Sequence, residues 1–257
     1  MRIVSLVPSL TSTLCAVGLR SQIVGCTKFC VVPADLHRDV TLVGGTKDPD
    51  IAAIRALRPT HILVNEEENT LAHVEEIRGM AATLVTFPKG PEDVPGMLRE
   101  MGAFFGSRSG CDELADRIDG MLASPAPRVS SCRYIYMIWQ SPYMTISNDT
   151  YIARCLDRLG WVNAIGEEST RYPQIEVAEI DQLQPDRILL ATEPYPFRAR
   201  DAGKLREQLA HGVEILRIDG RLTQWYGDLT ADLLLAMQKK DAGYPAFCSE
   251  FSGGAET

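Results

Sequence analysis

Two similar stretches of the sequence each run into a loop that carries glutamate. Residues 51–64 read IAAIRALRPTHILV, and residues 177–190, 126 positions further on, read VAEIDQLQPDRILL. In both, apolar residues three apart predict a short helix, a proline ends it, and an apolar run predicts a buried strand. The loops that follow read NEEEN and TEPYPF, so Glu67 and Glu193 share the 126-residue offset. Ligands and partners bind at the carboxyl ends of strands in open α/β sheets, so we expect both loops to be functional.

The acidic loop residues Glu66, Glu67, Glu68 and Glu193 are therefore candidates for docking a partner, and a solvated acidic loop is the alternative for any one of them. Aromatic residues also stand beside turn residues, in WQSPY at 139–143 and QWYG at 224–227. Loop aromatics suit a flat apolar ligand, because they bury its faces by stacking. For each single aromatic residue, packing in the core or at its rim is the alternative.

Signatures of catalysis are few. The sequence has no GxGxxG after a strand, no GxxxxGK[ST], no GxSxG and no HExxH, and its four histidines are scattered. The glycine pair before Thr46 and Lys47 lacks the spacing of a phosphate loop and is interpreted as a turn. A triad assembled in space stays open. We expect a protein that is not an enzyme, with no catalytic residues.

Composition narrows the class further. The net charge is −8 over 257 residues, which disfavours nucleic acid as a partner. Seven cysteines without a CxxC pair predict buried free thiols, with no structural metal and no intrinsic cofactor. No segment before residue 3 fits a secretory signal, and no apolar run is long enough to span a membrane. We expect a cytoplasmic protein as the sequence is written, a periplasmic one if it is a trimmed mature form, and a monomer.

The order of predicted elements is repeated along the chain. A weaker echo pairs Gly18 with Gly160, each placed to end a helix before an apolar strand. We predict strands near 2–7, 22–26, 61–65 and 83–87 in the first half, and near 133–138, 162–165, 187–191 and 214–218 in the second. Strands that alternate with helices predict parallel sheets, so we expect an α/β fold of two Rossmann-like lobes. We place an N-terminal lobe at 1–90, a helical segment at 91–124 and a C-terminal lobe at 125–257. The helical segment is predicted to break at 106–110 and to include a bridging backbone helix near 111–123.

Most of the chain resembles the helical-backbone metal receptor superfamily, the class III periplasmic binding proteins that include vitamin B12 and ferric-siderophore binding proteins. The segments that carry the resemblance are 2–19, 24–35, 43–69, 141–167, 171–197 and 223–230. The resemblance implies two mainly parallel lobes joined by one long helix, with a ligand cleft between them. It also implies that a surface glutamate of each lobe meets arginines of an ABC permease, and Glu66–Glu68 and Glu193 match those positions.

The chain is most similar to a signal-less subgroup in which segments like FCVHPA and WRxPWM recur. Val32 stands where the first segment has His, which removes a possible axial ligand for cobalt or iron. Gln140 and Tyr143 stand where the second has Arg and Trp, and Tyr143 keeps a stacking face.

Three functions follow as hypotheses. The first is a solute-binding protein of the ABC-transporter type, which binds a bulky corrinoid-like or metal-chelate ligand. The second is a cytoplasmic cofactor chaperone or enzyme of corrinoid metabolism. The third is a regulatory module that keeps the two lobes without using the cleft. The candidate ligand-binding residues of the first are Trp139, Tyr143, Trp225, Tyr226, Lys47, Asp149, Arg171 and Tyr172.

Overall fold

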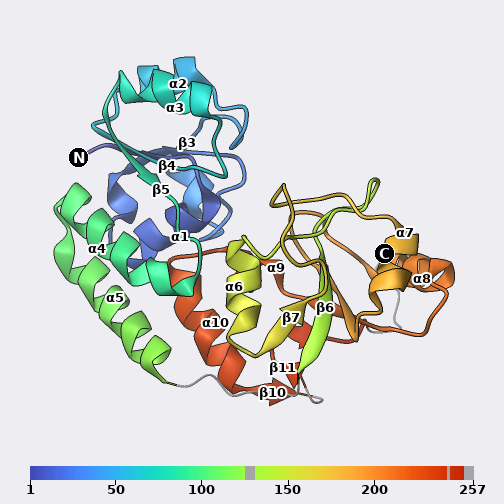
Figure 1. Ribbon diagram of the computed structural model, residues 1–257. Helices are drawn as coiled ribbons and strands as arrows, with labels where there is room; N and C mark the ends of the chain where they lie inside the picture. Colours follow the sequence, from blue (N-terminus) through green and yellow to red (C-terminus); the bar gives the residue numbers. More distant parts are fainter. Residues whose placement is uncertain (125–130, 242–243, 252–257) are drawn as a thin grey trace. The chain divides into compact units, whose positions relative to one another are not determined.

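The computed structural model describes residues 1–124, 131–241 and 244–251. The chain divides into two compact units (Figure 1). The first comprises Met1–Pro88, Glu92–Met121 and Trp225–Ala231, and the second comprises Lys89–Pro91, Leu122–Gln224 and Asp232–Thr257. The division of the chain at residues 90 and 124 stays a prediction, and residues 125–130, with which the predicted C-terminal lobe begins, lie outside the described part.

The first unit is built on a parallel sheet of five strands in the order β3-β2-β1-β4-β5. The strands are β1 (Ile3–Ser5), β2 (Ile23–Cys26), β3 (Thr41–Leu42), β4 (His61–Asn65) and β5 (Ala82–Thr86). All residues of β1 and four of the five in β4 are buried, as expected for strands covered on both faces.

Helices cover both faces of this sheet (Figure 1). They are α1 (Pro8–Ala16), α2 (Ile51–Ala56), α3 (Leu71–Arg78), α4 (Val94–Phe105) and α5 (Arg108–Ala123), with 3-10 turns η1 (Arg20–Gln22), η2 (Leu36–Arg38) and η3 (Pro91–Asp93). Apolar residues of α2 and α3, among them Ile54 and Ile77, pack against Val4 and Ile62 of the strands.

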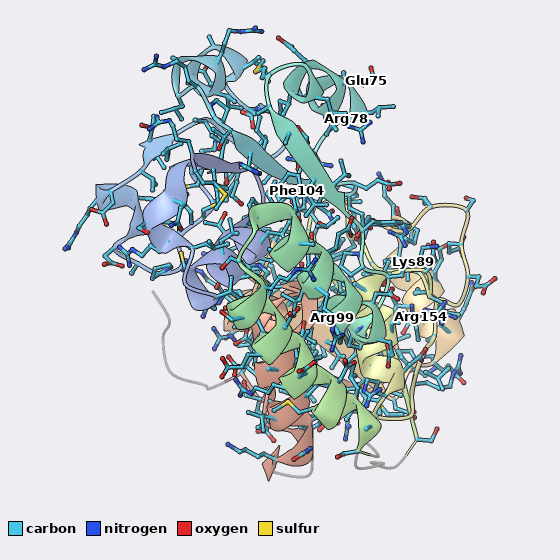
Figure 2. The ribbon with its side chains drawn as sticks, turned by 90° about the vertical axis from the view of Figure 1, so that its left-hand side faces the viewer. Glu75, Arg78, Lys89, Arg99, Phe104 and Arg154 are labelled. Atoms are coloured by element: carbon cyan, nitrogen blue, oxygen red, sulfur yellow. The ribbon has the colours of Figure 1, made fainter. Side chains whose placement is uncertain are left out.

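The segment predicted to be helical from 91 to 124 is helical, with the expected break at its middle. Gly106 ends α4 in the left-handed conformation, with φ of +63°, which glycine adopts without a steric penalty. Arg99 of α4 then pairs with Asp116 and Asp119 of α5 at 2.5 and 2.8 Å, and the two helices lie side by side (Figure 2).

The second unit repeats the architecture. Its sheet has the order β12-β9-β8-β6-β7, in which β12 (Cys248–Ser249) is antiparallel to β9 and the other neighbours are parallel. The remaining strands are β6 (Cys132–Met137), β7 (Trp161–Asn163), β8 (Arg187–Ala191) and β9 (Glu214–Ile218), and β10 (Lys240–Asp241) and β11 (Tyr244–Pro245) form a separate pair.

Its core lies between the sheet and two of the helices. Ile180 of α7 and Leu205 of α8 pack against Ile135, Ile188 and Ile215 of the strands. The helices are α6 (Tyr151–Asp157), α7 (Val177–Leu183), α8 (Ala199–Gln208) and α9 (Gly220–Gln224), together with α10 (Asp228–Gln238) from Asp232 onward. The residues of α10 before Asp232 belong to the first unit.

The 126-residue repeat is confirmed in the structure. Helix α2 begins at Ile51 and α7 at Val177, and β4 and β8 begin and end at the same offset. The weaker echo also holds, because Gly18 and Gly160 follow α1 and α6 with φ of +83° and +75°. Strand ends were predicted less well elsewhere: the strand expected at 2–7 covers three residues, because Pro8 opens α1.

All seven cysteines are free, and six of them are buried, as predicted for structural thiols. The seventh, Cys15, is half-buried. Buried free cysteine behaves as a small apolar residue, which agrees with the packing of Cys26 and Cys30 against Leu36.

Candidate functional site

Each sheet contains one point at which the strand order reverses. In the first unit the chain leaves β1 toward β2 on one side and leaves β4 toward β5 on the other, so the reversal lies between β1 and β4. In the second unit it lies between β6 and β8 for the same reason. Ligands of open α/β sheets bind outside the carboxyl ends of strands at such points. The loops at these points begin at residues 6, 66, 138 and 192.

In the first unit, two buried asparagines shape the acidic loop after β4. The side-chain oxygen of Asn65 accepts hydrogen bonds from the main-chain N–H groups of Glu67 and Glu68, at 2.8 and 3.2 Å. Asn69 donates to the carbonyls of Leu6 and Thr46, at 3.3 and 2.9 Å. Hydrogen bonds from these two buried side chains therefore fix the conformation of the loop and hold it against the segments that contain Leu6 and Thr46.

The three glutamates of this loop have different surroundings. Glu66 is exposed, whereas Glu67 and Glu68 are half-buried. Burial raises the pKa of Glu68, and the nearby ammonium of Lys47 opposes that rise. Lys47 also donates a hydrogen bond to the main-chain oxygen of Glu67. The structure thus brings Lys47, predicted to contact ligand, together with the residues predicted to dock a partner.

Trp225 and Tyr226 also belong to the first unit. Trp225 is half-buried, and Tyr226 is only 5% exposed. Burial raises the pKa of Tyr226 well above its ordinary value, and the polar side chains of Ser9 and Thr86 beside it oppose the rise. Tyr226 therefore lies beside Ser9 of α1 and Thr86 at the end of β5, and its predicted role in stacking on a ligand stays a prediction.

Asp228, which the sequence did not single out, connects α10 to α1. Its carboxylate accepts hydrogen bonds from Ser12 at 2.7 Å and Thr13 at 3.0 Å. Gly227, with φ of +103°, lies so close to Thr13 that a Cβ atom would come within 2.0 Å of its hydroxyl oxygen. In the sequence, Gly227 and Asp228 follow Trp225 and Tyr226 directly. Such a Gly-Asp pair indicates a turn, and it does not indicate that Asp228 contacts α1.

The second unit presents a cluster of aromatic side chains at its reversal point. The rings of Trp139 and Tyr195 meet edge to face at 5.6 Å between centroids, and those of Tyr195 and Phe197 at 4.8 Å. Tyr143 and Tyr195 pack against the core that contains Phe197. We call Trp139, Tyr143, Tyr195 and Phe197 the aromatic cluster. Trp139 is 41% exposed, so part of its indole faces solvent.

Short-range hydrogen bonds position this cluster. Ile138 N–H donates to the carbonyl of Met144 at 2.9 Å, and Met144 N–H donates to that of Trp139 at 3.1 Å. These bonds close the loop that carries Tyr143. Tyr195 lies in the TEPYPF loop noted in the sequence, but its ring contacts depend on a partner 56 positions earlier, which periodicity cannot show.

Asp149 and Arg171, both predicted to contact ligand, pair with each other at 3.1 Å. The Arg171 guanidinium holds the pKa of Asp149 below its ordinary value. The main-chain oxygen of Arg171 accepts a hydrogen bond from Ser147 N–H at 2.9 Å, and Tyr172, the next residue, is half-buried. This pair joins the segment before α6 to the segment before α7.

Glu193 is half-buried, and its main chain is held by a buried polar network. Gln224 donates to the carbonyl oxygen of Glu193 at 2.6 Å and to the hydroxyl of Tyr136 at 3.3 Å, and that hydroxyl lies 2.7 Å from Thr223. Burial raises the pKa of Tyr136 far above its ordinary value, so the hydroxyl stays protonated as a hydrogen-bonding group.

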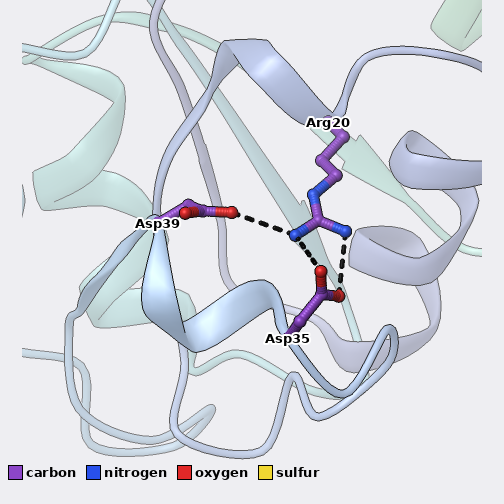
Figure 3. Close-up of polar contacts among 3 residues, drawn as sticks. All are labelled: Arg20, Asp35 and Asp39. Atoms are coloured by element: carbon purple, nitrogen blue, oxygen red, sulfur yellow. Dashed lines mark hydrogen bonds and ion pairs between the residues drawn. The ribbon is translucent and has the colours of Figure 1, made fainter.

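The loop after β2 contains Val32 and is held by ion pairs. Arg20 donates to Asp35 at 2.9 Å and to Asp39 at 3.0 Å (Figure 3). Val32 itself is half-buried, and Phe29 in the same loop is exposed. In the part of the chain that the structure describes, no three His, Cys, Asp or Glu residues are grouped to hold a metal ion.

No helix within the described ranges is both long enough and apolar enough to cross a membrane.

Several solved structures share this fold. One is the periplasmic vitamin B12 binding protein BtuF of Vibrio cholerae, with a TM-score of 0.75 at 17% identity over 92% of this chain and 94% of that one. Another is a periplasmic heme binding protein from Pseudomonas aeruginosa, with a TM-score of 0.74 at 20% identity over 99% of both chains. An ABC transporter substrate-binding protein from Listeria monocytogenes EGD-e has a TM-score of 0.71 at 18% identity over 93% and 97%.

A comparison with curated proteins finds no match. The family model described as periplasmic binding protein matches residues 3–210, which include both reversal points and the loops after β1, β4, β6 and β8. Membership of a family of binding proteins agrees with the expectation that the chain is not an enzyme. The chain belongs to the periplasmic binding protein family.

Proposed function

We propose that the chain is the substrate-binding protein of an ABC transporter and that its ligand is a bulky compound with a flat apolar face. A corrinoid, a haem-like macrocycle or a ferric chelate fits this description. The observation that carries the proposal is the part-exposed indole of Trp139 within the aromatic cluster, at the carboxyl ends of β6 and β8. Proteins of the same fold are described as binding vitamin B12 or heme, which supports this class of ligand.

The chemistry of the cluster favours a flat ligand. An exposed ring held by neighbouring rings offers a rigid face that loses little conformational entropy on binding. The Asp149–Arg171 pair of the same unit offers charged groups for polar substituents of the ligand. The absence of histidine at residue 32 favours recognition of the macrocycle or chelate as a whole over direct coordination of its metal at that position.

Titration of the purified protein with cyanocobalamin, haemin and a ferric siderophore tests the proposal by absorbance and calorimetry. We expect saturable binding of at least one compound. Trp139→Ala should weaken that binding by about ten-fold, and Trp139→Phe, which keeps a ring, by less. Val162→Ala, at an exposed apolar residue of β7, is the matched control. Absence of binding to all three compounds would contradict the ligand class.

We also propose that Glu66 and Glu193 dock the permease. Glu66 is the exposed glutamate of its loop, and the main chain of Glu193 is fixed by Gln224. Carboxylates at fixed positions can pair with arginines of a partner. The double variant Glu66→Gln/Glu193→Gln should lower transport or permease binding while ligand affinity is unchanged, and Glu75→Gln, an exposed glutamate of α3, serves as control. Normal transport by the double variant would refute the docking assignment.

The compartment is tested separately by cell fractionation. Recovery in the periplasm is expected for a transporter component. Recovery in the cytoplasm would instead favour the alternative of a cofactor chaperone.

A further inference from the structure

A cavity of about 450 Å³ lies beside the carboxyl ends of β8 and β9 in the second unit. Its lining includes Thr192 after β8, Arg217 and Asp219 at the end of β9, and Arg221 of α9. A cavity of this size accommodates a small molecule. We propose that it is a binding site for a small hydrophilic anion, a phosphate monoester or a carboxylate. This site goes beyond the proposed function, because none of the aromatic cluster lines it.

Two guanidinium groups line the cavity without a partner among the described residues. The side chains of Arg217 and Arg221 are exposed and form no ion pair or hydrogen bond with another residue of the described ranges. Arg99 and Arg20, in contrast, each pair with two carboxylates. A guanidinium presents its N–H groups as a planar fork that matches the oxygens of phosphate or carboxylate. Two such groups around one cavity therefore favour an anionic occupant.

The carboxylate of Asp219 is engaged with the main chain. One of its oxygens accepts the N–H groups of Arg221 and Leu222, at 3.0 and 3.3 Å. Because an acceptor-only group repels an anion, we expect Asp219 to contact a hydroxyl group of the ligand instead.

Thr192 supplies a third donor. Its hydroxyl oxygen accepts the N–H of Gly220 at 2.9 Å, which leaves its own hydrogen for an acceptor in the cavity. Donors from two arginines and one threonine, with carboxylates at the same rim, suit a hydroxylated phosphate monoester or hydroxycarboxylate more than a flat apolar molecule.

The test is calorimetric titration of the intact protein at pH 7 with inorganic phosphate, glycerol phosphate and citrate, and with glycerol as the neutral probe. We expect saturable binding of at least one anion and none of glycerol. Arg217→Gln and Arg221→Gln should each weaken it by about ten-fold or more, since each removes charge-assisted hydrogen bonds. Arg133→Gln, at an exposed arginine of β6 outside this lining, should bind like the wild type. Preference for glycerol phosphate or for citrate identifies the anion class.

Two results would overturn the proposal: no saturable binding of any of the three anions, or equal weakening by Arg133→Gln and the cavity variants. If either glutamine variant fails to fold, Thr192→Val tests the same site through the hydroxyl, and unchanged affinity in that variant counts against the site. The cavity variants should keep wild-type affinity for any corrinoid or haem compound that binds, and Trp139→Ala should keep wild-type affinity for the anion. Failure of the flat ligand to bind would therefore leave the anion result intact, and the reverse also holds.

Discussion

The hydroxyl of Ser12 donates a 2.7 Å hydrogen bond to the carboxylate of Asp228, 216 residues further along the chain. Thr13 donates to the other oxygen of that carboxylate at 3.0 Å. Because these groups are largely withdrawn from water, a missing acceptor would leave the Ser12 hydroxyl unsatisfied, whereas Thr13 can still donate to the carbonyl of Ser9 at 2.9 Å. Asp228 thus fixes the start of α10 against α1 within the first unit.

Removal of this acceptor should destabilise the protein. We expect Asp228→Ala to lower the free energy of unfolding by about 1–3 kcal/mol, the range for stranding buried polar partners. Urea denaturation measures the change. Asp232→Ala, at an exposed acidic residue of the same helix, is the control and should change stability by less than about 0.5 kcal/mol. Equal effects of the two substitutions would show that the hydrogen bonds contribute nothing.

The same carboxyl group should make stability depend on pH. Burial raises the pKa of Asp228 above its ordinary value of about 4, although Ser12 and Thr13 oppose the rise. The folded protein then holds the proton more tightly than the unfolded chain, so this contribution to stability is present below pH 4 and is lost as pH rises through the folded-state pKa. Asp228→Asn does not titrate, so its stability deficit relative to the wild type should be larger near pH 4 than at pH 7. A deficit that grows toward pH 7 in urea denaturation would contradict the direction of the shift.

Two glycines provide a matched test of backbone and packing. Gly227→Ala places a Cβ against the Thr13 hydroxyl at a positive φ, so we expect a loss of about 2 kcal/mol or more in the free energy of unfolding. Gly120, inside α5, has open space around its Cβ position. Gly120→Ala should stabilise the protein by up to about 1 kcal/mol, because alanine favours the helix. Thermal unfolding of both variants checks the opposite signs.

Thiol reactivity should follow burial. Cys15 is half-buried and the other six cysteines are buried, so a thiol reagent should label Cys15 first in the native protein. Burial raises the pKa of the Cys15 thiol, so labelling near pH 7 should still be slower than for a free thiol. Cys15→Ser should remove the native phase, and all seven thiols of the wild type should react in denaturant. A native phase that persists in Cys15→Ser would contradict the assignment.

The sequence predicted the order and positions of helices and strands better than the tertiary contacts between side chains. Strands β4 and β8 were placed to the residue, since a proline and a run of apolar residues limit both from local chemistry alone. The strand predicted at 2–7 was too long, because the apolar pattern did not show that the helix before Gly18 begins at Pro8. Local patterns of this kind describe one segment at a time.

The candidate site could be predicted only in part for the same reason. The loops after β4 and β8 were found from the repeat, whereas the ring contact of Trp139 with Tyr195 depends on the order of strands in the sheet. The burial of Tyr226 and the bonds of Asp228 depend on partners more than 130 positions away. Tertiary partners of that separation leave no periodic signal in one sequence.

Helices α2 and α7 begin 126 residues apart, and so do strands β4 and β8, so the two units share this helix and strand while the loops that follow differ. The loop after β4 reads NEEEN and the loop after β8 reads TEPYPF, so the same helix and strand arrangement carries an acidic loop in one unit and an aromatic loop in the other. In this architecture, exchange of a few loop residues can therefore change which ligand or partner is bound without any change in the sheet.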